Sequence, residues 1–138
     1  MNLATLRVHG TDAALHLLRS VLPIVADDTW SQGQKRRNGG FFTSSGFSVT
    51  VADQSNPDAM VASIRTFIAD CQRHEMLFRD PGISAELAIG VTVGEDDQFV
   101  ACVDLSHADL YALASLRIAL SIAAYPSSDE DHVSALSA

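Results

Sequence analysis

Histidine, cysteine and carboxylate side chains are the residues of this sequence that could hold a metal ion or transfer protons. The histidines are His9, His16, His74, His107 and His132. Asp12 and His16 are four residues apart, and Cys71 and His74 are three apart, so each pair could share one face of a helix. Neither pair has a third ligand nearby in the sequence, and neither has the spacing of a zinc site. We therefore expect ordinary helix-surface residues, with no metal site and no cofactor.

Nucleophilic catalysis has two candidate residues, a serine and a cysteine. Ser45 lies in the tripeptide Ser-Ser-Gly, without the strand-turn-helix pattern of a nucleophile elbow. Cys71 falls on the expected apolar face of a helix, where a thiol packs and does not react. Gly39 and Gly40 precede aromatic residues, and no lysine follows them at the spacing of a phosphate-binding loop. We therefore expect no catalytic residue and no enzymatic activity.

Carboxylates cluster at three places in the sequence. The clusters are Asp27 and Asp28; Glu95, Asp96 and Asp97; and Asp129, Glu130 and Asp131. The first two fall in an expected loop and an expected turn, and the third falls in a polar C-terminal segment. Such a cluster can attract a cation or a basic protein, and it can equally serve as a solvated surface that keeps the protein soluble. The turn at 95–97 is the first candidate for partner binding, and the pair at 27–28 is the next.

Lys35, Arg36 and Arg37 form a concentrated positive run on an otherwise acidic chain. This run could bind an acidic patch or a phosphate, and it could equally be three solvated charges on a loop without a function. Trp30 is the only tryptophan and stands shortly before the run. We favour a buried anchor of the loop for Trp30, and the alternative is an exposed hot spot for a partner.

Composition narrows the class of protein. The chain has 138 residues, of which 47% are hydrophobic and 19% are charged, which is typical of one globular domain. The net charge of -8 disfavours nucleic-acid binding, because nucleic-acid-binding proteins are usually basic. Neither a signal-peptide pattern nor an apolar stretch of membrane-spanning length is visible, so we expect a cytoplasmic protein without membrane contact. We expect Cys71 and Cys102 to be buried, reduced thiols, and a disulfide between them is the alternative.

Hydrophobic periodicity and turn residues predict the elements that must position these side chains. Strands are expected at 3–8, 24–26, 41–52, 87–93, 99–103 and 118–125. Helices are expected to begin after Thr11, at Pro57 and after Ser106, where a capping residue or a proline precedes an apolar stripe. We expect a loop over 27–40, a hairpin of strands 87–93 and 99–103 around the acidic turn, and a disordered acidic tail over 127–138.

This order predicts the α+β class. We expect one domain over 1–126 built as a two-layer sandwich, with an antiparallel-rich sheet of about six strands and three helices on one face. The predicted order is β-α-β-β-α-β-β-α-β, in which a ferredoxin-like core order is extended by a further β-α-β unit.

Four segments, taken with the order of elements, resemble a bacterial family of unknown function, domain family 4279. They are the segments WSQG at 30–33, SGFSV at 45–49, LSHADL at 105–110 and LSIAAY at 120–125. The resemblance spans about 4–126, although Phe47 stands where members often carry tryptophan. It implies a small cytoplasmic α+β domain without established catalytic residues, and some members are associated with polymorphic toxin systems as immunity proteins.

The expected function is protein binding without catalysis, most concretely that of an immunity protein that neutralises a bacterial toxin by direct binding. The acidic charge suits a basic partner such as a nuclease, because attraction between opposite charges speeds association. One alternative is a small-ligand-binding protein or an enzyme in which His16, His74 or His107 converges with carboxylates. Another is a structural homo-oligomer, such as a homodimer, that pairs through an open sheet edge.

Overall fold

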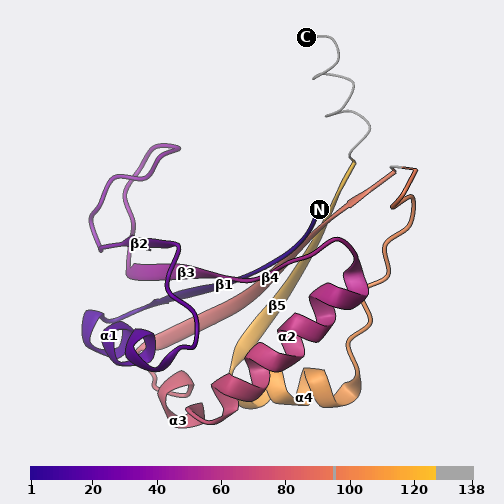
Figure 1. Ribbon diagram of the computed structural model, residues 1–138. Coiled ribbons are helices and arrows are strands. Elements are labelled where there is room, and N and C mark those ends of the chain that lie inside the picture. The colour runs from indigo at the N-terminus through magenta and orange to yellow at the C-terminus, as the bar shows by residue number, and fades with distance from the viewer. Residues whose placement is uncertain (95, 127–138) are drawn as a thin grey trace.

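The computed structural model of the chain describes residues 1–94 and 96–126. In these residues five strands form one sheet, and four helices lie on one of its faces (Figure 1). The strands are β1 (Asn2–Gly10), β2 (Asp28–Trp30), β3 (Ser45–Asp53), β4 (Ile83–Val93) and β5 (Ile118–Pro126). The helices are α1 (Asp12–Val21), α2 (Pro57–Gln72), α3 (Glu75–Phe78) and α4 (His107–Ser115). The α+β class is confirmed.

The sheet is mixed, and its strand order is β2-β3-β1-β4-β5. β1 is antiparallel to both β3 and β4, β2 is antiparallel to β3, and β5 is parallel to β4. The parallel pair is joined through α4, as parallel strands require a crossover. β2 and β5 are therefore the two edges of the sheet.

Alternating apolar residues place the core between the sheet and the helices. In β1, Ala4, Leu6 and Val8 are buried, while the intervening Arg7 is exposed. Because successive side chains of a strand point to opposite faces, one face of the sheet supplies the core and the other stays outside it. The long helix α2 packs its apolar stripe against this face through Met60, Val61, Ile64, Phe67, Ile68 and Cys71.

The three helix starts predicted from capping residues are confirmed. The Thr11 hydroxyl accepts a hydrogen bond from the amide of Ala14, and the Asn56 side chain accepts one from Ala59. Ser106 and Asp109 form a complete capping box in which each side chain accepts from the backbone amide of the other. Each of these contacts lies within one turn of the chain, which is why sequence spacing alone predicts them.

The predicted strand at 99–103, and with it the hairpin, is wrong. These residues form no strand, and the sheet has five strands where about six were expected. The physical reason lies in β4, because β1 occupies one of its edges and β5 occupies the other. Ala101 and Val103 are half-buried against the core, which explains why they alternate with polar neighbours outside a hydrogen-bonded ladder.

The predicted strand at 24–26 is also wrong. Ile24 and Ala26 pack against the core from an irregular segment, and strand β2 begins two residues later, inside the stretch expected to be a loop. β3 begins at Ser45, later than the expected start at Phe41, which is exposed.

The predicted ferredoxin-like element order does not match the chain, and neither does the number of helices. The observed order is β-α-β-β-α-α-β-α-β, because α3 follows α2 and no strand separates β4 from α4. Sequence reasoning missed α3 because it has only four residues and continues the apolar segment of the longer helix. The order of the strands in the sheet also differs from their order along the chain, because β3 lies between β1 and β2, and β1 lies between β3 and β4.

Two further expectations concern the tail and the membrane. The acidic tail at 127–138 lies outside the described residues. Among the helices of the described part, none combines the length and the apolar character needed to cross a bilayer.

Candidate functional site

The segment between β4 and α4 is fixed to the end of the sheet by a pair of side-chain amides. Asn2, on β1, is 1% exposed. Its Nδ2 donates to Oε1 of Gln98 at 2.9 Å, and Nε2 of Gln98 donates back to Oδ1 of Asn2 at 2.9 Å. Nε2 of Gln98 also donates to the carbonyl oxygen of Thr92, at the end of β4, at 2.6 Å. Gln98 therefore joins this segment to two neighbouring strands.

Immediately beside this anchor the chain presents two apolar side chains to solvent. Phe99 is 75% exposed and Val100 is 71% exposed. Asp96 and Asp97, on the other side of Gln98, are exposed as well. Gly94 turns the chain at a φ of 95°, a conformation that glycine adopts without strain. The structure thus places an exposed aromatic residue next to two carboxylates on an anchored loop; Glu95 lies outside the described residues.

The positive run lies at the opposite end of the sheet, on the connection between β2 and β3 (Figure 1). The guanidinium of Arg36 lies 5.4 Å from the ring centroid of Phe42, and that ring stacks on Trp30 at 5.1 Å with an interplanar angle of 18°. Lys35 forms an isolated backbone bridge with Phe41, and Arg37 is exposed. The acidic turn and the basic run therefore do not form one site.

Trp30 lies in strand β2 and not in a loop, and it is half-buried. Its ring lies directly on Gly46 of β3, where an added Cβ would come within 2.4 Å of a ring carbon. The ring of His9 lies 5.4 Å away, centroid to centroid. Nε1 of Trp30 is buried without an acceptor among the described residues. Trp30 thus anchors the edge strand to the sheet through its ring.

Asp27 and Asp28 differ in what they contact. The Asp27 carboxylate accepts hydrogen bonds from both the backbone amide and the hydroxyl of Thr50, on β3. Asp28 is exposed on the short edge strand. Asp27 therefore fixes the chain just before β2, although it is exposed like Asp28.

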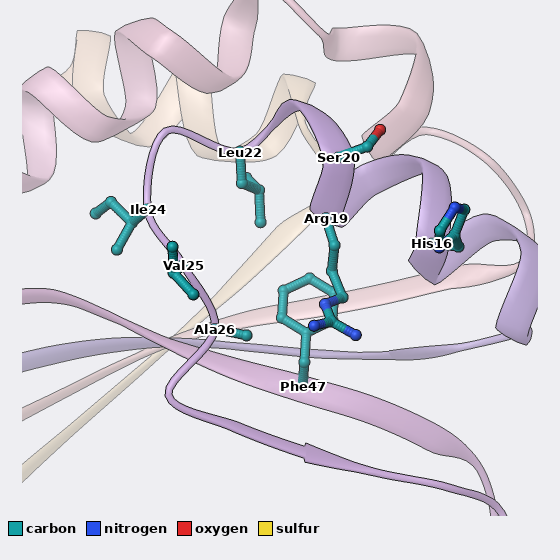
Figure 2. A pocket seen from close by; sticks show the side chains of 8 residues that line it. All are labelled: His16, Arg19, Ser20, Leu22, Ile24, Val25, Ala26 and Phe47. Atoms are coloured by element: carbon teal, nitrogen blue, oxygen red, sulfur yellow. The ribbon is translucent and has the colours of Figure 1, made fainter.

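A groove of about 460 Å³ lies between α1 and β3 (Figure 2). Figure 2 shows the Arg19 side chain reaching from α1 over the ring of Phe47, whose centroid is 5.9 Å from the guanidinium carbon. His16 and Ser20 lie on the same helix and point away from that ring (Figure 2). A smaller cavity of about 260 Å³ shares His16, Arg19 and Phe47 with the groove and is also lined by Asp12.

The convergence of histidines and carboxylates that an enzyme would need is formed neither in the groove nor in the smaller cavity. The smaller cavity holds His16 and Asp12, but His74 immediately precedes α3 and His107 begins α4. Within residues 1–94 and 96–126, no three His, Cys, Asp or Glu side chains come together as metal ligands would.

One ion pair joins α4 to α2. The sequence predicted the capping role of Asp109 but did not reveal its partner, Arg65. Asp109, predicted as a capping residue, also accepts from Nε of Arg65 at 3.1 Å and pairs with Nη2 of the same residue at 3.0 Å. The hydrogen bond from Arg65, followed by those from Ser106, lowers the pKa of the Asp109 carboxyl below its ordinary value. Arg65 lies 44 residues away in the sequence, so spacing could not reveal it.

The two cysteines differ, and the expectation that both are buried is wrong for one of them. Both thiols are free, so the disulfide alternative is not formed. Cys71 is buried in α2, and burial raises the pKa of its thiol to about 12. Cys102 is exposed, because it lies in the irregular segment that was expected to be a strand.

Asn2, Gln98 and Phe99 belong to the candidate site, and the sequence alone did not point to them. The two amides are 96 residues apart, and nothing in the local sequence of either one marks it as a partner. Phe99 begins the segment 99–103 that was predicted to be a strand, and the structure instead leaves its side chain exposed on a loop. The run of three acids just before it was the one local signal of a solvent-facing loop.

Comparisons with known protein families, with curated proteins and with solved structures find no match to this chain.

Proposed function

We propose that this chain is a non-enzymatic protein-binding domain that uses the anchored loop at 94–100 to contact its partner. The observation that carries the proposal is the exposure of Phe99 and Val100 beside Asp96 and Asp97, on a loop that Gln98 fixes to the sheet. Aromatic side chains dominate the energetic centre of protein interfaces, and charged side chains around them act mainly on the rate of encounter.

The anchor supports this use of the loop on thermodynamic grounds. A loop that is already held in place loses less conformational freedom when a partner binds, so more of the contact energy appears as affinity. Gln98 provides this restraint at the position directly before Phe99. A flexible loop carrying the same exposed residues would pay an ordering cost of about 0.5–1.5 kcal/mol for each immobilised side chain.

In its most concrete form, the proposal is that this chain is an immunity protein of domain family 4279, which neutralises a bacterial toxin by covering the active surface of the toxin. The sequence resemblance and the net charge of -8 support this form. A basic toxin such as a nuclease would be attracted by Asp96 and Asp97, and Phe99 would then supply apolar contact area in the complex.

The test uses the protein encoded by the gene next to the one that encodes this chain, because toxin and immunity genes usually lie side by side. The two proteins are purified separately, and association rates are measured at several salt concentrations. Replacing Asp96 and Asp97 by Asn should slow association roughly 3- to 30-fold at low salt, with a loss that shrinks as salt rises. Phe99→Ser should instead speed dissociation, because it removes the apolar contact and leaves the charges.

A matched control removes the same number of charges elsewhere. Asp12→Asn with Asp80→Asn alters two exposed carboxylates near the Gly10 end of β1, the end opposite to Asn2. If this control slows association as much as the loop variant does, net charge and not the loop steers the encounter. If Phe99→Ser leaves the dissociation rate unchanged, the loop does not contact the partner and the proposal fails.

A further inference from the structure

In the part of the chain that the structure describes, one edge of the sheet lacks most of the features that usually prevent strand edges from pairing. β5 is an edge strand of nine residues, with the sequence IALSIAAYP, and it contains no charged residue. Proteins commonly protect an open edge with charged side chains, with proline, with an inserted residue or with a very short strand. The one proline of β5, Pro126, is its last residue and leaves the rest of the edge unprotected. The opposite edge, β2, follows this rule, since it has three residues and begins with the exposed Asp28.

The side chains of β5 are exposed on both faces of the sheet. Of the nine residues only Ile118 is buried, and seven are exposed. Leu120 and Ile122 pair in register with Leu87 and Ile89 of β4, which are 2% exposed, so all four share the face that carries the helices. Nevertheless Leu120 is 36% exposed and Ile122 is 51% exposed, since α4 does not cover them.

We propose that β5 pairs with β5 of a second copy of this chain, antiparallel and about a two-fold axis at Ile122, to form one continuous sheet across a homodimer. Ile122 is the central residue of the strand, with four residues on either side. A two-fold interface brings the same surface of both copies together, so the edge must be complementary to itself. This inference is independent of the proposed function of the 94–100 loop.

The sequence of the strand is complementary to itself in side-chain size. In this register Ile122 meets Ile122 of the second copy, and Leu120 meets the smaller Ala124. On the other face Tyr125, which is 51% exposed, meets Ala119. Leu120 and Tyr125 thus each lie opposite an alanine, which suits the spacing of about 4.5–5.5 Å between directly opposed residues, and the terminal Ile118 lies opposite Pro126.

Charge also favours a second copy over a charged partner strand. Each chain carries a net charge of -8, yet none of that charge lies on β5, so two copies can approach along this edge without like charges meeting.

The first test is the oligomeric state, measured by sedimentation equilibrium over a concentration series of the full chain. We expect a monomer–dimer equilibrium for the wild type. Ile122→Lys, which sets two ammonium groups opposite each other, should raise the dimer dissociation constant about 100-fold. Leu17→Lys is the matched control, since Leu17 is 53% exposed on α1, away from the edge, and this variant should dimerise as the wild type does.

The second test fixes the register. In a Cys102→Ser background, Ile122→Cys should form a disulfide with its own copy under mild oxidation, because directly opposed residues have the Cα separation that a disulfide requires. Leu120→Cys is the control, since two copies of this residue would lie four positions out of register and should not cross-link.

Three results would overturn the proposal. The first is a wild-type chain that stays monomeric throughout the concentration series, including the case in which truncation after Pro126 then produces a dimer, because the C-terminal segment would be what covers the edge. The second is a dimer that Ile122→Lys does not weaken. The third is cross-linking by Leu120→Cys without cross-linking by Ile122→Cys.

Discussion

Replacing Gln98 by Ala tests whether the side-chain amide pair holds the β4–α4 segment to the sheet. The substitution removes the two hydrogen bonds with Asn2 and the one to the carbonyl of Thr92. Nδ2 of Asn2 keeps its bond to the carbonyl of Gln54, whereas Oδ1 loses its partner in a residue that is 1% exposed. A buried polar atom left without a partner costs about 1–3 kcal/mol, so we expect the free energy of unfolding to fall by about 2 kcal/mol.

The assay is chemical denaturation followed by circular dichroism, with thermal melting as a second measure. A loss of about 2 kcal/mol corresponds to a fall in Tm of about 8 °C for a chain of this size. Gln32→Ala is the matched control, because Gln32 is an exposed glutamine outside the pair, and it should stay within about 0.5 kcal/mol of the wild type.

A double-mutant cycle separates the amide pair from other effects of the substitution. Asn2→Ala, Gln98→Ala and the double variant should give a coupling energy of about 1 kcal/mol or more, because the two side chains bond to each other directly. A coupling energy near zero, or a Gln98→Ala variant as stable as the control, would refute the claim that this pair anchors the loop.

Three further predictions concern the sheet, the ion pair and the thiols. Gly46→Ala should destabilise the protein by about 1–3 kcal/mol and shift the fluorescence of its only tryptophan, because the new Cβ would lie within 2.4 Å of the indole ring. Asp109→Asn should cost about 1 kcal/mol near pH 7. Because the hydrogen bond from Arg65 holds the pKa of the folded Asp109 carboxyl below its ordinary value, Asp109 stabilises the fold while it is ionised, and the difference between variant and wild type should shrink in acid as the carboxyl becomes protonated. A thiol reagent at pH 8 should modify one cysteine of the native chain, Cys102, and two after denaturation, because Cys71 is buried with a pKa of about 12. For Asp109→Asn, a stability difference from the wild type that grows as the pH falls would contradict the prediction. For the thiols, rapid labelling of both cysteines in the native chain would do so.

The elements that the sequence predicted correctly depend on contacts a few residues long. Thr11, Asn56 and Ser106 cap helices through amides three residues ahead, and the alternation in β1 follows from the geometry of a single strand. The errors at 24–26 and 99–103 arise because alternation reports which side chains face the core and not whether a neighbouring strand is available to pair with. Both segments pack apolar residues on the core without joining the sheet.

For the candidate sites, the sequence located the charged clusters and the structure decided what lies beside them. The acidic turn at 95–97 was predicted from residue types alone, because three adjacent carboxylates favour solvent. That Gln98 bonds to Asn2, that Phe99 faces outward, and that Trp30 stacks on Phe42 all depend on segments brought together by folding.

The sequence by itself determined the α+β class, the starts of α1, α2 and α4 and the alternation of buried residues in β1, since these follow from the periods of helix and strand and from local capping. Only the tertiary structure decided the order of the strands, and with it which strand lies at an open edge. The absence of charge from β5 was visible in the sequence, but a buried central strand would show the same pattern. Its position at the edge depends on which strands pair with β4, and such pairing is a contact between distant segments that no local pattern specifies.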